Sequence, residues 1–271
     1  MDTMERLFGT RKPIIAMLHF PGLPGRPRHD RAAGASRLVD VVGRDLAVLQ
    51  SAGVDGLLFC NEADLPYQLA VGPEIPAAMA AVIGQLRSDV TVPFGVNILW
   101  DARSSLALAR ATGARFIREV LTGVYESDLG MIEPRIGEIA GYRTAIGADE
   151  VALFDNIAPE FASAVGRRTV AERARGAAFL GMDAILISGP AAGVPFEMSD
   201  LVAAKEAAPT VPVVANTGVR ADRIAEIFAV ADAAIVGTSL KYDGTTWNAV
   251  DPERAERLMD AARAARASLT A

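Results

Sequence analysis

Eight short apolar runs alternate with helix-like segments along the chain, and this alternation constrains the fold more than any other feature of the sequence. The runs are residues 14–18, 56–59, 94–99, 116–118, 151–154, 184–187, 212–215 and 233–236. Near-continuous apolar composition is typical of parallel strands that are covered on both faces. The segments between the runs have helical spacing, so the pattern predicts parallel βαβ units.

The number of these units predicts a closed barrel. A chain of 271 residues is close to the ~250 that one (β/α)₈ barrel typically uses. We therefore predict an α/β fold, a single (β/α)₈ TIM barrel of the phosphate-binding kind that spans residues 1–271. An open doubly wound sheet is the alternative, but such a sheet rarely has eight evenly spaced units.

The loops differ in length on the two sides of the predicted barrel. The connections from helix to strand are short and contain Gly53, Gly113 and Gly181, each suited to ending a helix. The connections from strand to helix are long, as in residues 19–33, 60–74, 120–130 and 237–251. Long loops at the carboxyl ends of the strands predict that the functional site lies on that face.

Composition excludes several classes of protein. The chain has a formal net charge of -6 and a pI near 5.1, which does not suit a general nucleic-acid binder. A lone cysteine, Cys60, cannot form an intrachain disulfide. There is no signal-peptide pattern at the N-terminus and no apolar run of the ~20 residues that a membrane span needs. We therefore expect a soluble, cytoplasmic protein without a transmembrane segment, and a homo-oligomer is an assembly that the sequence leaves open.

The seventh and eighth runs end abruptly in small polar residues, which predicts a phosphate site. Turns rich in glycine and hydroxyl side chains expose backbone N–H groups that hold anions, and barrels of this kind commonly bind phosphate there. Ordinary turn chemistry is the alternative explanation. Lys241 or Arg220 could add positive charge. The predicted phosphate-binding residues are Ser188, Gly189, Asn216, Thr217, Gly218, Gly237, Thr238 and Ser239.

Two residues at strand ends are predicted to exchange protons with a substrate. His19 follows the first run and Asp155 follows the fifth, which places them on opposite sides of the barrel mouth. The alternatives are that His19 binds a loop backbone group, and that Asp155 caps a helix or pairs with Arg118. Asn61, Asn97 and Arg118 are predicted to orient substrate hydroxyls or an enediolate oxygen.

Other polar residues near the strand ends suggest no cofactor. Cys60 beside apolar neighbours is most simply a small buried side chain. Tyr242 and Trp247 either form a lid or pack the last long loop onto the barrel. A divalent metal remains an alternative, because Glu119, Asp155, Asp64 and His19 are residue types that ligate metals, but no close-spaced motif such as H-E-x-x-H is present.

Several segments of the sequence resemble the BtpA/SgcQ family. They are residues 12–25 (KPIIAMLHFPGLPG), Asn61 with residues 64–67 (DLPY), 94–101 (FGVNILWD), 116–118 (FIR), 235–244 (IVGTSLKYDG) and 247–252 (WNAVDP). The resemblance spans nearly the whole chain and implies a phosphate-binding TIM barrel. Members of the family are associated with photosystem I assembly, and others resemble sugar-catabolism proteins or phosphoribosylanthranilate isomerases.

The chain departs from this family pattern at two strand ends. Where the resemblance leads one to expect Glu-Asn after the second strand, the chain has Cys60-Asn61. Where an Asp followed by a Lys-His pair is expected after the fifth strand, residues 155–160 read DNIAPE. We predict an enzyme that isomerises, epimerises or cleaves a small phosphorylated sugar or related phosphate ester. The alternative is a non-catalytic phosphate-binding or assembly factor.

Overall fold

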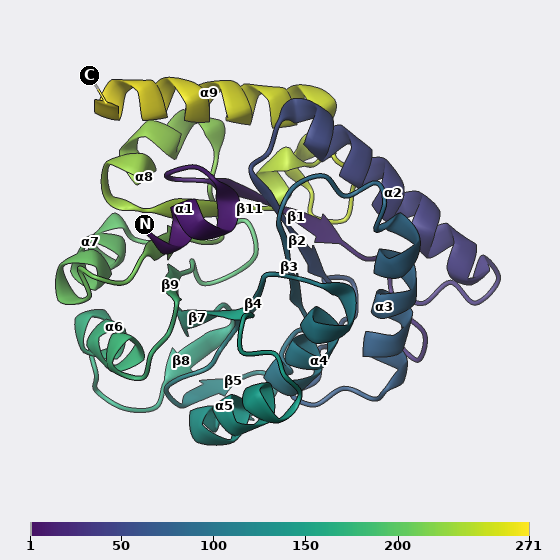
Figure 1. Cartoon of the computed structure of the whole chain (residues 1–271), viewed down its shortest axis with the longest axis horizontal. Coiled ribbons are helices and arrows are strands. Elements are labelled where there is room, and N and C mark those ends of the chain that lie inside the picture. The colour runs from purple at the N-terminus through teal and green to yellow at the C-terminus, as the bar shows by residue number, and fades with distance from the viewer. Residues whose placement is uncertain (1, 271) are drawn as a thin grey trace.

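The computed structural model describes residues 2–270 and contains a closed barrel of eight parallel strands (Figure 1). The order around the barrel is β1-β11-β10-β9-β7-β4-β3-β2. This confirms the predicted (β/α)₈ fold, while the predicted domain boundaries at residues 1 and 271 lie outside the described part of the chain. The barrel strands are β1 (Ile14–His19), β2 (Gly56–Cys60), β3 (Phe94–Asn97), β4 (Phe116–Glu119), β7 (Ala152–Ala158), β9 (Ala184–Ile187), β10 (Val213–Ala215) and β11 (Ala233–Val236).

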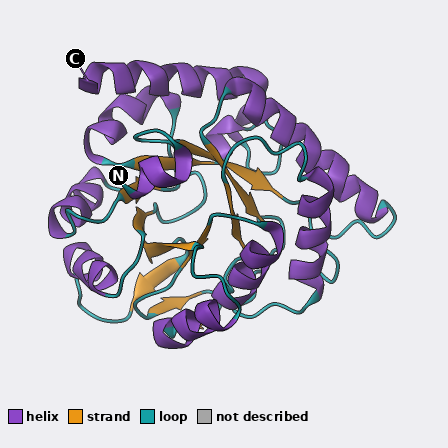
Figure 2. Ribbon diagram, in the orientation of Figure 1, coloured by secondary structure: helices purple, strands orange, loops and turns teal. Residues whose placement is uncertain are grey.

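Helices surround the barrel as an outer ring (Figure 2). Gly53, Gly113 and Gly181 take positive φ values of 82°, 79° and 80° at helix ends, as predicted for short connections back to the next strand. The helices of the ring are α2 (Gly34–Ala52), α3 (Glu74–Leu86), α4 (Ala102–Thr112), α5 (Ile136–Ala145), α6 (Val170–Phe179), α7 (Met198–Ala207), α8 (Ile224–Val230) and α9 (Pro252–Thr270).

Alternation along each strand divides the core into two layers. Residues such as Ile15, Leu58 and Phe154 fill the inside of the barrel, whereas Leu18 and Leu57 point outward to the helices. Successive side chains of a strand point to opposite faces, so every second residue of each strand belongs to the same layer. The same alternation decides which polar residues at the strand ends face the interior.

A short N-terminal helix that the sequence analysis did not predict lies at the amino ends of the strands. This helix, α1 (Thr3–Phe8), contributes Met4, Leu7 and Phe8 to the inner layer. The Phe8 ring contacts the Phe116 ring edge to face, with 5.6 Å between the ring centroids. The amino end of the barrel is therefore filled with apolar side chains, and the opposite end is left for the site.

A three-stranded antiparallel sheet, also not predicted, is formed by the segments that follow β4 and β7. It consists of β5 (Tyr125–Ser127), β6 (Gly130–Ile132) and β8 (Ala162–Ala164), in the order β6-β5-β8. β7 itself runs four residues beyond the predicted end at Phe154, with a register irregularity between Asn156 and Ala158. The loop after β7 therefore begins later than the sequence suggested.

Candidate functional site

A cavity of about 360 Å³ opens at the carboxyl ends of the barrel strands. It brings together the ends of β1, β4, β10 and β11 with the loops that follow β2, β3 and β7. Its polar lining consists of His19, Glu62, Tyr67, Arg118, Glu160, Asn216, Thr217, Arg220, Thr238, Ser239, Thr246 and Arg254. The cavity lies on the face that the long loops predicted.

His19 ends β1 and faces the cavity, as the sequence predicted for its position. Its Nδ1 atom is buried and has no hydrogen-bond partner among residues 2–270. Burial first, and then the positive charges of Lys241 and Arg118, lower the pKa of His19 well below its ordinary value. A neutral imidazole with one unused nitrogen is able to accept a proton or to hydrogen-bond a ligand.

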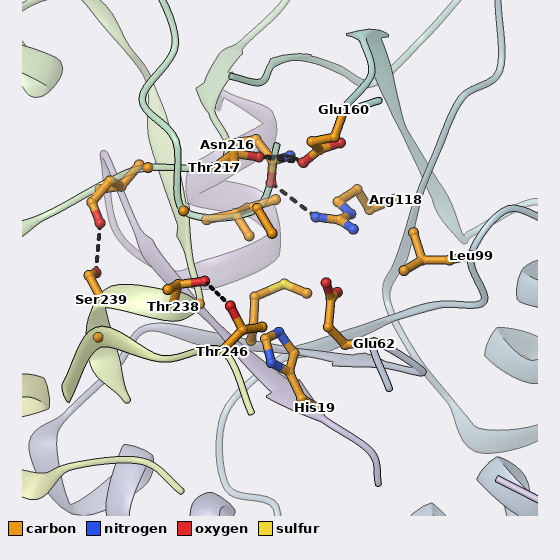
Figure 3. Close-up of a pocket in the computed structure, with 18 of the residues that line it drawn as sticks. His19, Glu62, Leu99, Arg118, Glu160, Asn216, Thr217, Thr238, Ser239 and Thr246 are labelled. Carbon is orange, nitrogen blue, oxygen red and sulfur yellow. Dashed lines mark hydrogen bonds between the residues drawn. The ribbon is translucent and has the colours of Figure 1, made fainter. Parts of the chain in front are cut away.

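Glu62 supplies a carboxylate beside His19 that the sequence analysis missed (Figure 3). The hydroxyl of Tyr67 donates to Glu62 Oε1 over 3.2 Å. Burial raises the pKa of Glu62, and the charge of Arg118 opposes this effect. Cys60 lies one inward position earlier, and its thiol, whose pKa is raised by burial, lies 3.6 Å from Glu62 Oε2. Cys60 is thus a buried thiol, and Glu62, two residues further along the chain, supplies the carboxylate of the site.

Arg118 crosses the inside of the barrel from β4. Its Nη2 donates to Asn97 Oδ1 over 2.7 Å, and its Nη1 donates to Asn216 Oδ1 over 3.2 Å. Asn97 also donates through Nδ2 to Oε1 of Glu119, which lies behind β4, over 2.7 Å. Asn97 therefore orients Arg118 from below the cavity, whereas Arg118 itself lines the cavity.

Glu160, the second carboxylate that the sequence analysis missed, holds the end of β10. Its Oε1 accepts hydrogen bonds from Thr217 Oγ1 and, over 3.3 Å, from Asn216 Nδ2. Its Oε2 accepts from Asn156 Nδ2 over 3.1 Å. Ser188 joins the same network, because its hydroxyl accepts from Asn216 Nδ2 over 2.7 Å. Three protein donors bind the two carboxylate oxygens of Glu160, so this residue positions the β10 turn.

The two predicted glycine turns lie side by side at one end of the cavity. Gly218 has φ +69°, and a Cβ there would overlap the backbone of Pro195. A Cβ at Gly237 would lie 3.4 Å from the His19 ring, which places the imidazole against the β11 turn. The cavity at these turns is also lined by Thr238, Ser239, Arg220 and Arg254. Hydroxyl and guanidinium groups thus line this end of the cavity, where Ser239 Oγ donates to Val219 O over 2.7 Å. Gly189 packs behind them against Val194.

Asn61 and Asp155 point away from the cavity. Asp155 lies between Leu153 and Ile157, which belong to the outer layer, and it accepts hydrogen bonds from Leu121 N (2.8 Å) and Thr122 Oγ1 (2.5 Å). Burial raises the pKa of Asp155 to about 6, against the effect of these hydrogen bonds. Asn61 accepts from Leu99 N over 2.8 Å and donates to Asp64. Both residues hold loops in place. Asp155 neither caps a helix nor pairs with Arg118, which were the two alternatives that the sequence suggested.

Neither Lys241 nor Trp247, both from the segment after β11, lines the cavity. Lys241 is buried in an ion pair with Asp45 of α2. Trp247 is 51% exposed, and the guanidinium of Arg28, from the loop after β1, lies 4.6 Å from its ring centroid. Across residues 2–270, no group of three or more His, Cys, Asp or Glu side chains is arranged to hold a metal ion.

The closed parallel barrel, with its cavity at the carboxyl ends of the strands, defines the class of TIM-barrel proteins. Within this class, the chain belongs to the BtpA family, which it matches over residues 10–264. It is 42% identical to the putative sgc region protein SgcQ of Escherichia coli (strain K12), covering 96% of this chain and 97% of that protein. It is 33% identical to the photosystem I biogenesis protein BtpA of Synechocystis sp., covering 96% and 91%.

Solved structures of other TIM-barrel proteins share the fold at low sequence identity. (S)-3-O-geranylgeranylglyceryl phosphate synthase from Thermoplasma acidophilum, in complex with sn-glycerol-1-phosphate, has a TM-score of 0.62 and 17% identity, covering 96% of this chain and 97% of that one. Phosphoribosyl anthranilate isomerase from Thermus thermophilus has a TM-score of 0.56 and 13% identity, covering 95% and 99%. None of the helices within residues 2–270 has the length and apolar character needed to cross a membrane.

Proposed function

We propose that the chain is an enzyme that acts on a small phosphorylated sugar or a related phosphate ester by isomerisation, epimerisation or aldol-type cleavage. The observation that carries this proposal is that one cavity joins the β10 and β11 glycine turns to His19, Glu62 and Arg118. A ligand with an anionic group at the turns would present the rest of its carbon skeleton to these three side chains. The phosphate esters named for the two structural neighbours support the same ligand class.

The phosphate is proposed to bind at Gly218, Gly237, Thr238 and Ser239. Backbone N–H groups at such turns favour anions, and guanidinium groups bind phosphate through paired donors. Arg220 and Arg254 line the cavity at this end, although each also has a carboxylate partner, Asp222 and Asp251 respectively. An arginine that pairs with one carboxylate still has N–H donors for a phosphate, since a guanidinium carries five.

Proton transfer is proposed to involve His19 and Glu62. Neutral His19 is able to accept a proton from carbon or oxygen, and Glu62, with its raised pKa, holds a proton to higher pH than an exposed glutamate does. Arg118 is placed to stabilise negative charge that develops on an enediolate oxygen between them. In the sequence-based mechanism Asp155 was the partner of His19, but its outward position favours Glu62 for this role.

The test is proton exchange on candidate substrates. Thermal-shift measurements with sugar phosphates and simple phosphate esters select ligands, and each ligand that stabilises the protein is then incubated with enzyme in D₂O. Incorporation of deuterium at carbon, or formation of an isomer or cleavage product, supports the proposal. Wild-type rates in both His19→Asn and Glu62→Gln would contradict the proposed mechanism.

A non-catalytic phosphate-binding or assembly factor is the second candidate. It is favoured by the biogenesis role named for the cyanobacterial relative, and by the departure of this chain from the family pattern at Cys60 and after Asp155. Ligand stabilisation without exchange or turnover would favour it, and any turnover would exclude it. The sequence leaves a homo-oligomer open, and sedimentation velocity measures the oligomeric state.

A further inference from the structure

A buried ion pair fastens the loop after β11 to helix α2. Lys241 Nζ lies 2.6 Å from Asp45 Oδ2, and the two residues are 1% and 5% exposed. A buried charge without a partner is strongly unfavourable, so each residue restricts where the other lies. The pair therefore connects two parts of the chain that are 196 residues apart in sequence.

The same aspartate also holds the far end of this loop. Asp45 Oδ1 accepts a hydrogen bond from Val250 N over 2.9 Å, and Lys241 and Val250 form an antiparallel bridge. Tyr242 N donates to Ala249 O over 3.0 Å. Residues 241–250 thus form a loop whose two ends meet at one buried carboxylate.

This closed loop supplies one wall of the cavity. The hydroxyls of Thr238, which precedes the loop, and Thr246, which lies within it, are 2.9 Å apart, and both residues line the cavity. The backbone of Thr246 also acts on the imidazole of His19 and raises its pKa, against the effect of burial. Figure 3 shows Thr246 between Thr238 and the His19 ring. A displacement of the loop would therefore move the hydroxyls of Thr238 and Thr246, which line the cavity, and would change the surroundings of the His19 ring.

We propose that the Asp45–Lys241 pair is a positioning device, which holds the loop against α2 so that Thr238, Thr246 and His19 are correctly placed for the ligand. Neither charged group needs to touch the ligand, since each is buried against the other. The effect on ligand binding rests on the phosphate site proposed above. The effect on His19 does not, because Lys241 acts on the imidazole whether or not a ligand is bound.

The test compares Lys241→Met and Lys241→Arg with a matched control, Lys205→Met. Lys205 also forms a 2.6 Å ion pair, with Asp232, but outside the barrel interior and away from the cavity. Two quantities are measured: the Kd of inorganic phosphate by calorimetry, and the pKa of the His19 imidazole by NMR. The chain has only two histidines, so His29→Gln assigns the signals.

We expect Lys241→Met to weaken phosphate binding about tenfold and to raise the pKa of His19, because a nearby positive charge is removed. Lys241→Arg should restore the wild-type pKa of His19 and most of the affinity, and Lys205→Met should change neither. A folded Lys241→Met protein with wild-type affinity and wild-type His19 titration would overturn the proposal.

A folding defect does not prevent the test. If Lys241→Met fails to fold, the double variant Asp45→Asn/Lys241→Met leaves no unpaired buried charge and still removes the lysine. An unchanged pKa of His19 in that variant would also overturn the proposal. If the wild type does not bind phosphate, the proposed phosphate site is wrong, while the His19 titration continues to decide the role of the ion pair.

Discussion

Arg118 on β4 donates a hydrogen bond to Asn216 on the carboxyl side of β10, over 3.2 Å, and so joins two strands that are not neighbours in the barrel. The two residues are separated by 98 positions in sequence and by β7 and β9 in the barrel. The guanidinium thereby connects the proton-transfer side of the proposed site with the proposed phosphate turns. A residue in this position is expected to affect both binding and turnover.

Replacement of Arg118 by methionine should lower turnover on an identified substrate by about 100-fold or more, since developing negative charge loses its donor. It also leaves Oδ1 of Asn97 without the 2.7 Å hydrogen bond from Arg118, which is expected to cost about 1–3 kcal/mol of unfolding free energy. Arg118→Lys should retain part of the activity. Arg115→Met, which removes an exposed arginine at the amino end of the same strand, serves as the control. Steady-state kinetics and urea unfolding measure the two effects, and equal losses in both methionine variants would contradict this assignment.

His19→Asn and Glu62→Gln should each reduce turnover by about 10²–10⁴-fold, because each removes a proton-transfer group while keeping similar volume. The pH profile of kcat/KM distinguishes the two residues. In the wild type, the titration of Glu62, whose pKa is raised by burial, should produce one limb of this pH profile. Glutamine does not titrate, so Glu62→Gln is expected to lose that limb. Asp155→Asn tests the mechanism that the sequence suggested. A larger loss of kcat in Asp155→Asn than in Glu62→Gln, with folding intact, would restore Asp155 as the catalytic acid.

The barrel was predictable because its signals are local. Each strand is a short apolar run, and three of the return turns have a glycine (Gly53, Gly113 and Gly181) that adopts positive φ at the end of a helix. Helix α1 and the small sheet carried no comparable signal. β8 is only three residues long, and it pairs with β5 from a loop 35 or more residues earlier. Such short strands depend on tertiary contacts rather than on their own composition.

The site was predictable in part, and strand parity explains the difference. Reading the first polar residue after each strand selected His19 and Arg118, which face inward, but also Asn61 and Asp155, which face outward. Side chains alternate between faces, so counting by two from Cys60 would have selected Glu62. Strand parity does not assign Glu160, because this residue lies beyond the end of β7 at Ala158 and after the register irregularity between Asn156 and Ala158.

Gly218→Ala should destabilise the protein and weaken phosphate binding. The residue has φ +69°, and an added Cβ would overlap the Pro195 backbone, so a cost of at least about 2 kcal/mol is expected. Gly141→Ala is the matched control: it is an exposed position in α5 with open space around it, and alanine there should gain about 0.5–1 kcal/mol. Chemical unfolding and phosphate titration measure the two variants. A Gly218→Ala protein of wild-type stability and affinity would show that this turn does not need its observed conformation.

Glu119 should make the protein less stable as the pH rises. It is buried behind β4, where burial raises its pKa to about 8 against hydrogen bonds from Ser105 Oγ (2.6 Å) and Asn97 Nδ2 (2.7 Å). The unfolded chain releases this proton near pH 4.5, so between about pH 4.5 and 8 the folded state binds more protons than the unfolded state. The contribution of Glu119 is therefore lost as the pH rises through this window, by at most about 1.4 kcal/mol per pH unit.

Glu119→Gln is expected to flatten this dependence, because glutamine keeps the acceptor oxygen for Ser105 and Asn97 but carries no charge. Urea midpoints at pH 5.5, 7 and 8.5 measure the change, with the exposed Glu133→Gln as the control. Relative to the wild type, Glu119→Gln should gain stability as the pH is raised, since the wild type must then bury an ionised carboxylate or unfold. Parallel pH curves for the wild type and Glu119→Gln would show that Glu119 does not carry the buried proton.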